Sequence, residues 1–186
     1  MRDERKRTSK QIPLIDISSV LGASRGNKNV VAKELAREFD RTFRDVGFCL
    51  IVGFEKVLSR ETINTVRKES EAFFRLSAKE KEKAAADDGF AGYRAVGAEN
   101  VGASAGKPTE HPDPVESMNL SGYQENEGWT LKEAIEGKAP WRRAAYVRGM
   151  PASLRKACAD YAAGVTSIMS ALMLITESAL DLPRGF

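Results

Sequence analysis

The feature of this sequence that most restricts its fold is a long apolar stripe near its end. Between about residues 152 and 180, apolar side chains recur in alternating steps of four and three, the spacing of one face of an α-helix. Pro151 precedes this segment and Pro183 follows it, the positions that proline favours at helix ends. We therefore predict a single long helix over about 152–180. Its stripe consists of Leu154, Cys158, Tyr161, Val165, Ile168, Leu172, Ile175 and Ala179, broadened by Met169, Met173 and Leu174.

Such an apolar face needs a surface to cover it. Burying five or six large side chains contributes about 1.5–3 kcal/mol each, on the order of 10 kcal/mol together. That sum rivals the whole stability of a typical domain, about 5–15 kcal/mol. We expect a β-sheet outside this sequence to cover the face. The alternatives are a small helical bundle that closes on itself and a coiled-coil dimer seam.

The same segment raises the question of a membrane span. Its uninterrupted apolar part, 162–176, is about 15 residues long. A spanning helix needs roughly 18–20. Asp160 and Glu177 stand on either side of it. We therefore predict a buried helix and no membrane contact.

Short strands and helices alternate before this helix. The apolar runs at 12–17 and 48–52 are typical of strands, and the second is predicted to be buried on both faces. Helices are predicted at about 30–46, where Gly47 ends the pattern, and from about Ser59 onward. Ser77 and Glu80 form a capping-box pattern that begins a short helix. The alternating charges at 79–83 indicate that this short helix has a solvated face.

The middle of the chain carries weaker signals. Residues 88–114 are rich in Gly, Ala and Pro and are predicted to form a long surface loop. Thr130 and Glu133 form another capping-box pattern. The order of elements predicts an α+β fold with too few strands to close a barrel or sandwich by itself.

Charge and cysteine content narrow the partners and the compartment. We predict that residues 1–11 form a basic disordered tail, with a localisation signal or a phosphate-binding arm as the alternatives. The 29 basic and 26 acidic residues leave a net charge of only +3, which argues against a nucleic-acid partner. Two widely spaced cysteines and the lack of an apolar segment behind the charged start predict a reducing, cytoplasmic location.

Several short motifs follow one another along the chain. They are IPLIDIS from Ile12, FRDVGFCLIVGF from Phe43, AFFRLSAKEKEK from Ala72, Gly92-Tyr93, DPVESMNLS from Asp113, and Trp141 with PASLRKACADY and ALDLPRGF. In this order they resemble the N-terminal region of the isopenicillin N synthase-like family of iron(II)- and 2-oxoglutarate-dependent oxygenases. The most specific motif is the FF-x-L-x-x-x-E-K pattern within AFFRLSAKEKEK. One departure is Gly53-Phe54-Glu55, where the family usually has Asn-His-Gly.

The resemblance implies a dioxygenase, an oxidoreductase that acts on a small organic molecule. In this family a double-stranded β-helix, or jelly-roll, supplies two His and one Asp to a non-haem iron and an Arg to 2-oxoglutarate. Residues 12–186 correspond to the helical and short-strand part that precedes this barrel, whose core is missing from the sequence. We therefore expect Fe(II) and 2-oxoglutarate to bind the intact enzyme and not this truncated chain alone, which offers no catalytic residues.

One short motif imitates a metal site. His111-Pro112-Asp113 spells the H-x-D pattern of the family's first two iron ligands, but Pro112 suits a loop better than a central strand. His111 is also the chain's one histidine, so a two-His site cannot form within a single copy. We therefore predict no metal ligands. Cys49 and Cys158 lie in apolar segments and are predicted to be small core residues.

Tyr93 and Arg94 are the candidate substrate-binding residues. By resemblance, the Gly92-Tyr93 loop lies near the mouth of the barrel pocket, where an aromatic ring and a cation could contact substrate. The alternative for Tyr93 is a structural role in packing this loop down. For the whole chain two functions stay open: the N-terminal half of an oxygenase, whose partner is the missing barrel, or a non-catalytic module whose apolar helix pairs with a homologous or other chain.

Overall fold

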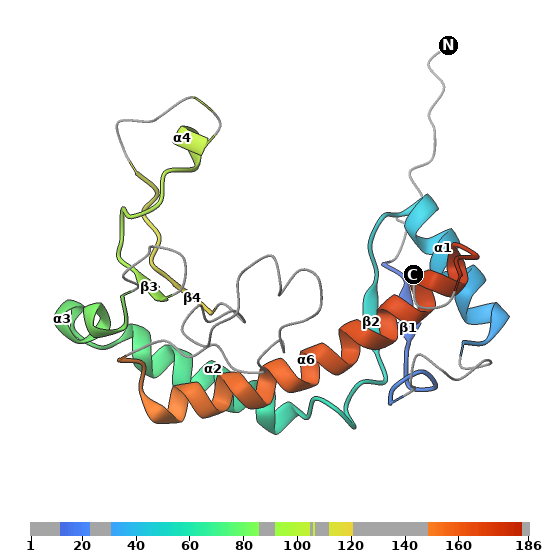
Figure 1. Ribbon diagram of the computed structural model, residues 1–186, viewed down its shortest axis with the longest axis horizontal. Coiled ribbons are helices and arrows are strands. Elements are labelled where there is room, and N and C mark those ends of the chain that lie inside the picture. Colours follow the sequence, from blue (N-terminus) through green and yellow to red (C-terminus); the bar gives the residue numbers. More distant parts are fainter. Residues whose placement is uncertain are drawn as a thin grey trace, which may run out of the picture. The chain divides into compact units, whose positions relative to one another are not determined.

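The protein is described from a computed structural model, which defines residues 12–22, 31–85, 92–104, 106, 112–120 and 149–183 (Figure 1). Helices and short strands alternate, and no barrel is present among these residues. The capping-box pattern at 130–133 and the tail at 1–11 lie outside the described residues. The elements are β1 (Leu14–Asp16), α1 (Lys33–Asp45), β2 (Leu50–Val52), α2 (Arg60–Phe74), α3 (Ala78–Lys81), the 3₁₀ helix η1 (Glu82–Ala84), β3 (Gly92–Arg94), α4 (Val101–Ser104), β4 (Ser117–Asn119) and α6 (Ala152–Ala179).

The chain forms two compact units, residues 1–59 with 164–186 and residues 60–163. In the first unit β1 and β2 form a two-stranded parallel sheet in which Leu14 pairs with Leu50. Successive side chains of a strand point to opposite faces, so Ile15 and Ile17 share the inner face. Both are fully buried, in a core with Val20 that Ala171 and Ile175 of α6 complete.

The outer face of this sheet carries large apolar side chains that remain exposed. Phe48, Leu14 and Leu50 are 55%, 59% and 53% exposed. The prediction that 48–52 is a strand buried on both faces is therefore wrong, and the strand itself begins only at Leu50. Ile51, the next residue of β2, points to the inner face and packs against the core. The described residues of this unit thus cover one face of the sheet and leave the other open.

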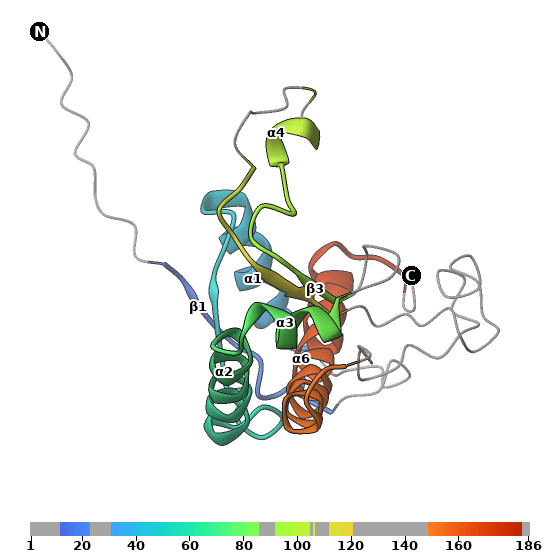
Figure 2. The same cartoon turned by 90° about the vertical axis from the view of Figure 1, so that its left-hand side faces the viewer.

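The second unit contains α2, α3, the strands β3 and β4, and the N-terminal turns of α6. β3 and β4 pair antiparallel with Tyr93 opposite Met118. Within this unit α2 and the N-terminal turns of α6 run side by side (Figures 1 and 2). The prediction of a long surface loop over 88–114 is only partly right, because β3 and α4 lie within it. The core of this unit consists of Phe73, Ala84, Tyr93, Met150 and Leu154.

The predicted long helix is confirmed as α6, Ala152–Ala179. Its apolar stripe is covered unevenly: Leu154 and Ile175 are buried, whereas Tyr161, Met169 and Met173 are exposed. The described residues thus bury the helix only in part, and that a sheet outside this sequence covers the remainder stays a prediction. The chain itself covers both ends of the stripe, and side chains between them face outward.

Helix α6 is long and apolar enough to cross a membrane by length and composition. The 15-residue count underestimated it because the helix continues to 28 residues. In its most apolar stretch 22% of the residues are buried. One helix of this kind is a weak indication, since the core helix of a globular protein has the same length and composition. The residues that α6 adds to both cores fit that second reading.

Two positions require glycine: Gly164, where α6 passes close to another segment, and Gly47, where the chain leaves α1 with a positive φ. Gly164 of α6 passes so close to the 57–58 segment that a Cβ there would lie 2.8 Å from the Val57 carbonyl oxygen and 2.9 Å from the Leu58 side chain. Gly47 has a positive φ of 90°, and its N–H donates to the Thr42 carbonyl oxygen, so the predicted end of α1 is confirmed.

Candidate functional site

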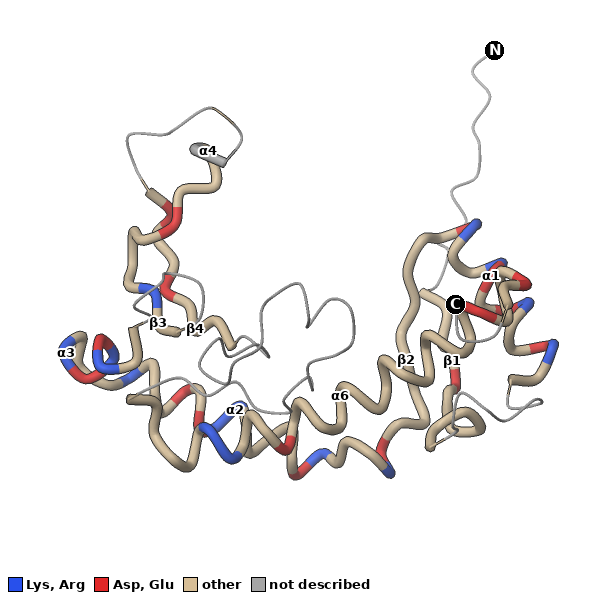
Figure 3. The backbone as a smooth tube through the Cα atoms, viewed as in Figure 1, with Lys and Arg blue, Asp and Glu red and all other residues tan. Residues whose placement is uncertain are grey.

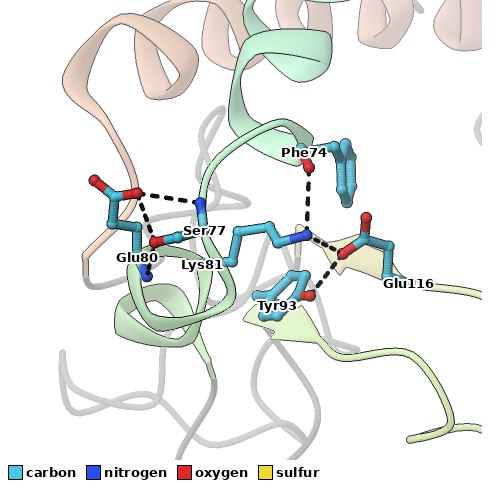
Figure 4. A network of polar contacts seen from close by, with 6 residues as sticks. All are labelled: Phe74, Ser77, Glu80, Lys81, Tyr93 and Glu116. Carbon is cyan, nitrogen blue, oxygen red and sulfur yellow. Dashed lines mark hydrogen bonds and ion pairs between the residues drawn. The ribbon is translucent and has the colours of Figure 1, made fainter.

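A cluster of polar side chains joins α2, α3 and the β3–β4 hairpin in the second unit (Figure 4). We call Lys81, Tyr93 and Glu116, with the contacts described below, the Lys81 network. Helix α3 is held at its start by the predicted capping box. The Glu80 N–H donates to Ser77 Oγ at 3.4 Å, and the Ser77 N–H donates to Glu80 Oε2 at 3.1 Å. This reciprocal pair sets the direction of the single turn that ends at Lys81.

Lys81 points inward from the end of this turn. Its side chain is only 11% exposed, so the prediction of a solvated face over 79–83 is wrong at this position. The Nζ ammonium donates to Glu116 Oε2 at 2.5 Å and to the Phe74 carbonyl oxygen, in the last turn of α2, at 3.3 Å. It also lies 5.4 Å from the centroid of the Tyr93 ring, within the range of a cation–π contact.

Tyr93 enters the same network from β3. It is 6% exposed, and its ring meets Phe73 edge-on with the centroids 5.8 Å apart. Its hydroxyl donates to Glu116 Oε2 at 2.6 Å, so one carboxylate oxygen accepts from both Tyr93 and Lys81. The tyrosine thus presents its apolar body to the core and its polar tip to a charged partner.

The electrostatics of the network favour the ion pair. The hydrogen bond from Lys81, followed by that from Tyr93, lowers the pKa of Glu116. The hydrogen bond to Glu116 raises the pKa of Lys81 and also that of Tyr93. The ammonium, the neutral phenol and the carboxylate are therefore the forms present near neutral pH. A carboxylate held this way is a poor proton acceptor, so the network suits a structural role better than proton transfer.

Arg94 lies one residue further along β3, and strand alternation directs it to the face opposite Tyr93. Its Nη1 is 3.5 Å from Glu99 Oε1, which also accepts from Ser117 Oγ at 2.9 Å. The loop beyond is held by Asp113, whose Oδ2 accepts from the Val101 N–H and whose own N–H donates to the Glu99 carbonyl oxygen, both at 2.8 Å. Arg94 remains about one-third exposed on this braced hairpin.

The amino-acid sequence of this region matches a known family. A family model described as non-haem dioxygenase in morphine synthesis, N-terminal, matches residues 12–144. The chain belongs to this family of non-haem dioxygenase N-terminal regions. The predicted resemblance to 2-oxoglutarate- and iron(II)-dependent oxygenases is thereby confirmed. Strands β1 to β4 lie within the match, together with the whole Lys81 network.

A single relative illustrates the match. The chain is 34% identical over 97 residues to a homoarginine-6-hydroxylase, 2-ODD-C23.1, from Arabidopsis thaliana. The aligned segment is 50% of this chain and 28% of that relative. The comparison therefore covers well under a third of the hydroxylase.

The two predicted site residues have different environments. Tyr93 and Arg94 are adjacent in β3, so their side chains point to opposite faces of the hairpin. Tyr93 is buried and packs the hairpin down, as expected if its role is structural. Contact of either residue with a substrate stays a prediction. Lys81 and Glu116 were missed by sequence reasoning, although the DPVESMNLS motif contains Glu116 and the FF-x-L-x-x-x-E-K motif ends at Lys81.

The remaining candidates add no reactive group. His111 lies outside the described residues. Cys49 and Cys158 are half-buried beside the two cores, and burial raises the pKa of each thiol, which disfavours the thiolate form that reacts as a nucleophile. Phe54, at the position of the family's usual histidine, also packs against the first core.

The iron and 2-oxoglutarate implied by the family do not fit the residues that the structure describes. Their iron site needs two imidazoles and a carboxylate on one face of the metal. The sequence has one histidine, and no group of three His, Cys, Asp or Glu side chains converges among the described residues. An open hollow of about 280 Å³ between α2 and α6 is lined by Thr62 and Ala157 with the exposed Glu61, Thr65, Lys156 and Asp160. Lys156 and Asp160, four residues apart on α6, form an ion pair at 2.6 Å.

Proposed function

We propose that this chain is the N-terminal, supporting region of a non-haem iron(II)- and 2-oxoglutarate-dependent dioxygenase that acts on a small organic molecule. The family match over 12–144 supports this assignment. Because the chain has one histidine, the iron ligands and the jelly-roll barrel that carries them belong to residues other than these 186. The chain by itself is then inactive, and its contribution is to support the barrel and one side of the substrate pocket.

The observation that carries this proposal is the open outer face of the β1–β2 sheet. Parallel strands normally have both faces covered, yet Leu14, Leu50 and Phe48 are more than half exposed, with Ile12 beside them. Covering such half-exposed side chains contributes about 1–1.5 kcal/mol each, on the order of 5 kcal/mol for the four. We propose that the barrel covers this face, so that the supporting region and the catalytic barrel fold as a single unit.

Substrate contact is proposed for the β3–β4 hairpin. The partly exposed guanidinium of Arg94 offers a cation to a carboxylate, while the buried Tyr93 holds the strand in place. The Arabidopsis relative is named for homoarginine. Amino acids of this kind are therefore the first compounds to test. Hydroxylation, desaturation and cyclisation are all within the chemistry that iron and 2-oxoglutarate support in such enzymes.

A chimera tests the proposal. Residues 12–144 replace the corresponding N-terminal region of the Arabidopsis hydroxylase, and iron binding and succinate release from 2-oxoglutarate are measured. We expect iron at one per chain and turnover in the chimera, and neither in the 186-residue chain alone. A soluble, folded chimera without iron or turnover would contradict the proposal, and so would stoichiometric iron on the chain alone.

A matched pair of variants tests the sheet face in the same chimera. Leu14→Lys with Leu50→Lys places charges under the proposed barrel contact and should abolish soluble, iron-loaded protein. Val96→Lys is the control, because Val96 is also an exposed apolar residue but lies in the loop after β3. Equal behaviour of the two would show that the barrel does not lie on this face.

The exposed portion of α6 favours a second candidate, a non-catalytic interaction module. Met169 and Met173 are exposed and four residues apart, so they share one side of the helix. A homologous chain could cover this side. Sedimentation should then show self-association that Met169→Gln with Met173→Gln abolishes. A monomer that binds no apolar dye would exclude this candidate.

We further propose a cytoplasmic protein without nucleic-acid or membrane partners. Figure 3 shows basic and acidic residues interspersed along α1 and α2, so these two helices offer no basic stripe to a polyanion. Both ends of α6 contribute to cores of the chain itself, as expected of a helix that stays out of the bilayer. Fractionation of cells that express the tagged chain tests this, and recovery in the membrane pellet after a high-salt wash would contradict it.

A further inference from the structure

One ammonium group ties together the segments of the second unit that surround the hairpin (Figure 4). Lys81 comes from the end of α3, the Phe74 carbonyl from the last turn of α2, and Glu116 from the residue just before β4. Tyr93 of β3 reaches the same carboxylate oxygen with its hydroxyl. Both strands of the hairpin are therefore held to the helical layer through Glu116 and Lys81.

We propose that Lys81 is a positioning residue that holds the β3–β4 hairpin, and with it Arg94, against the end of α2. The proposal rests on the proposed function only where it gives Arg94 a substrate to contact. The anchoring itself is a property of this chain and is measured without any substrate.

The charges explain why the Lys81 network depends most on Lys81. Without its ammonium, Glu116 would keep only the Tyr93 hydroxyl, and a half-buried carboxylate would have lost its counter-charge. The last-turn carbonyl of Phe74 would also lose a donor at the negative end of the α2 dipole. Leaving such groups unpaired costs more than the pair contributes when it is intact. Movement of the Glu116 carboxylate into water would restore its solvation, and this movement would displace the hairpin.

Movement of Glu116 is transmitted to Arg94 through the register of the hairpin. Tyr93 pairs with Met118 and Arg94 with Ser117, next to Glu116. Each strand is only three residues long, so few ladder bonds resist a shift. A slip by one residue would exchange the two faces of the strand and turn Arg94 toward the core. The anchor therefore determines both the place and the face of the arginine.

Hydrogen exchange measured by mass spectrometry on the full 186-residue chain tests this inference. Lys81→Met keeps the aliphatic stem and removes the charge, and Lys79→Met is the control because Lys79 is exposed on the same short helix. We expect Lys81→Met to speed exchange at 92–94 and 117–119 about tenfold or more, the scale of one lost charged hydrogen bond. Exchange around Ala171 and Ile175 should stay unchanged, and Lys79→Met should change neither region.

The Glu116→Gln variant distinguishes two roles of Lys81: anchoring the hairpin through Glu116, and only capping the end of α2. If Lys81 acts through Glu116, then Glu116→Gln alone speeds exchange in the hairpin, and adding it to Lys81→Met causes little further change. If Lys81 only caps α2, exchange rises at the end of α2 while the hairpin and the Gln variant stay protected, and the proposal is overturned. A uniform rise across both units also overturns it. Should Lys81→Met fail to fold, the Gln variant alone decides between these outcomes. An anchor seen in this assay would stand even if the chimera were inactive.

Discussion

Replacing Ile175 by alanine tests whether the chain really covers its own long helix. Ile175 is 0% exposed in the first core, whose other buried members are Ile15, Ile17, Val20 and Ala171. The change removes three carbon atoms at about 0.8 kcal/mol each, or about 2.4 kcal/mol. The cavity left behind raises the expected loss in free energy of unfolding to about 3–4 kcal/mol. Met173→Ala, at an exposed position on the same helix, should cost less than about 0.5 kcal/mol.

Urea denaturation followed by circular dichroism gives these free energies, and thiol labelling localises the effect. Cys49 packs against the same core as Ile175, whereas Cys158 packs against the core of the second unit. Ile175→Ala should therefore speed labelling of Cys49 more than that of Cys158, and Leu154→Ala should do the reverse. If Ile175→Ala cost no more than Met173→Ala, the described core around α6 would be refuted, and an external covering surface would be required.

Two further changes have clear expectations. Gly164→Ala should destabilise the first unit by about 1–3 kcal/mol in urea denaturation, because the new methyl group would meet the Val57 carbonyl oxygen at 2.8 Å; a neutral or stabilising result would refute this close approach. The Lys81 network should lose stability at both extremes of pH. The lowered pKa of Glu116 adds stability above the ordinary value of 4.5 that is lost as the pH falls through the lowered value. The raised pKa values of Lys81 and Tyr93 add stability that is fully present below the ordinary values of 10.5 and 10.0. This stability is lost as the pH rises through the raised values. Urea midpoints measured across pH should therefore fall at both ends, and the combined Lys81→Met and Glu116→Gln variant should show a flatter profile.

Features set by neighbouring residues were predictable from the sequence. The period of the apolar stripe determined α6 almost to the residue, because helix formation along a stripe depends on spacing within a few turns. The Ser77–Glu80 capping box and the end of α1 at Gly47 were predictable for the same reason. The family motifs, which are also local strings, predicted the N-terminal oxygenase region that the match to 12–144 confirms.

Features that depend on distant residues were decided only by the tertiary structure. Lys81 resembles any charged residue of an exposed turn, and only the return of the chain 35 positions later brings Glu116 to its ammonium. The same holds for the 48–52 run, whose apolar composition is equally compatible with a strand covered on one face or on both. Periodicity determines which side chains share a face. Whether that face is covered depends on which other segment lies against it, and the residues of the face itself do not identify that segment.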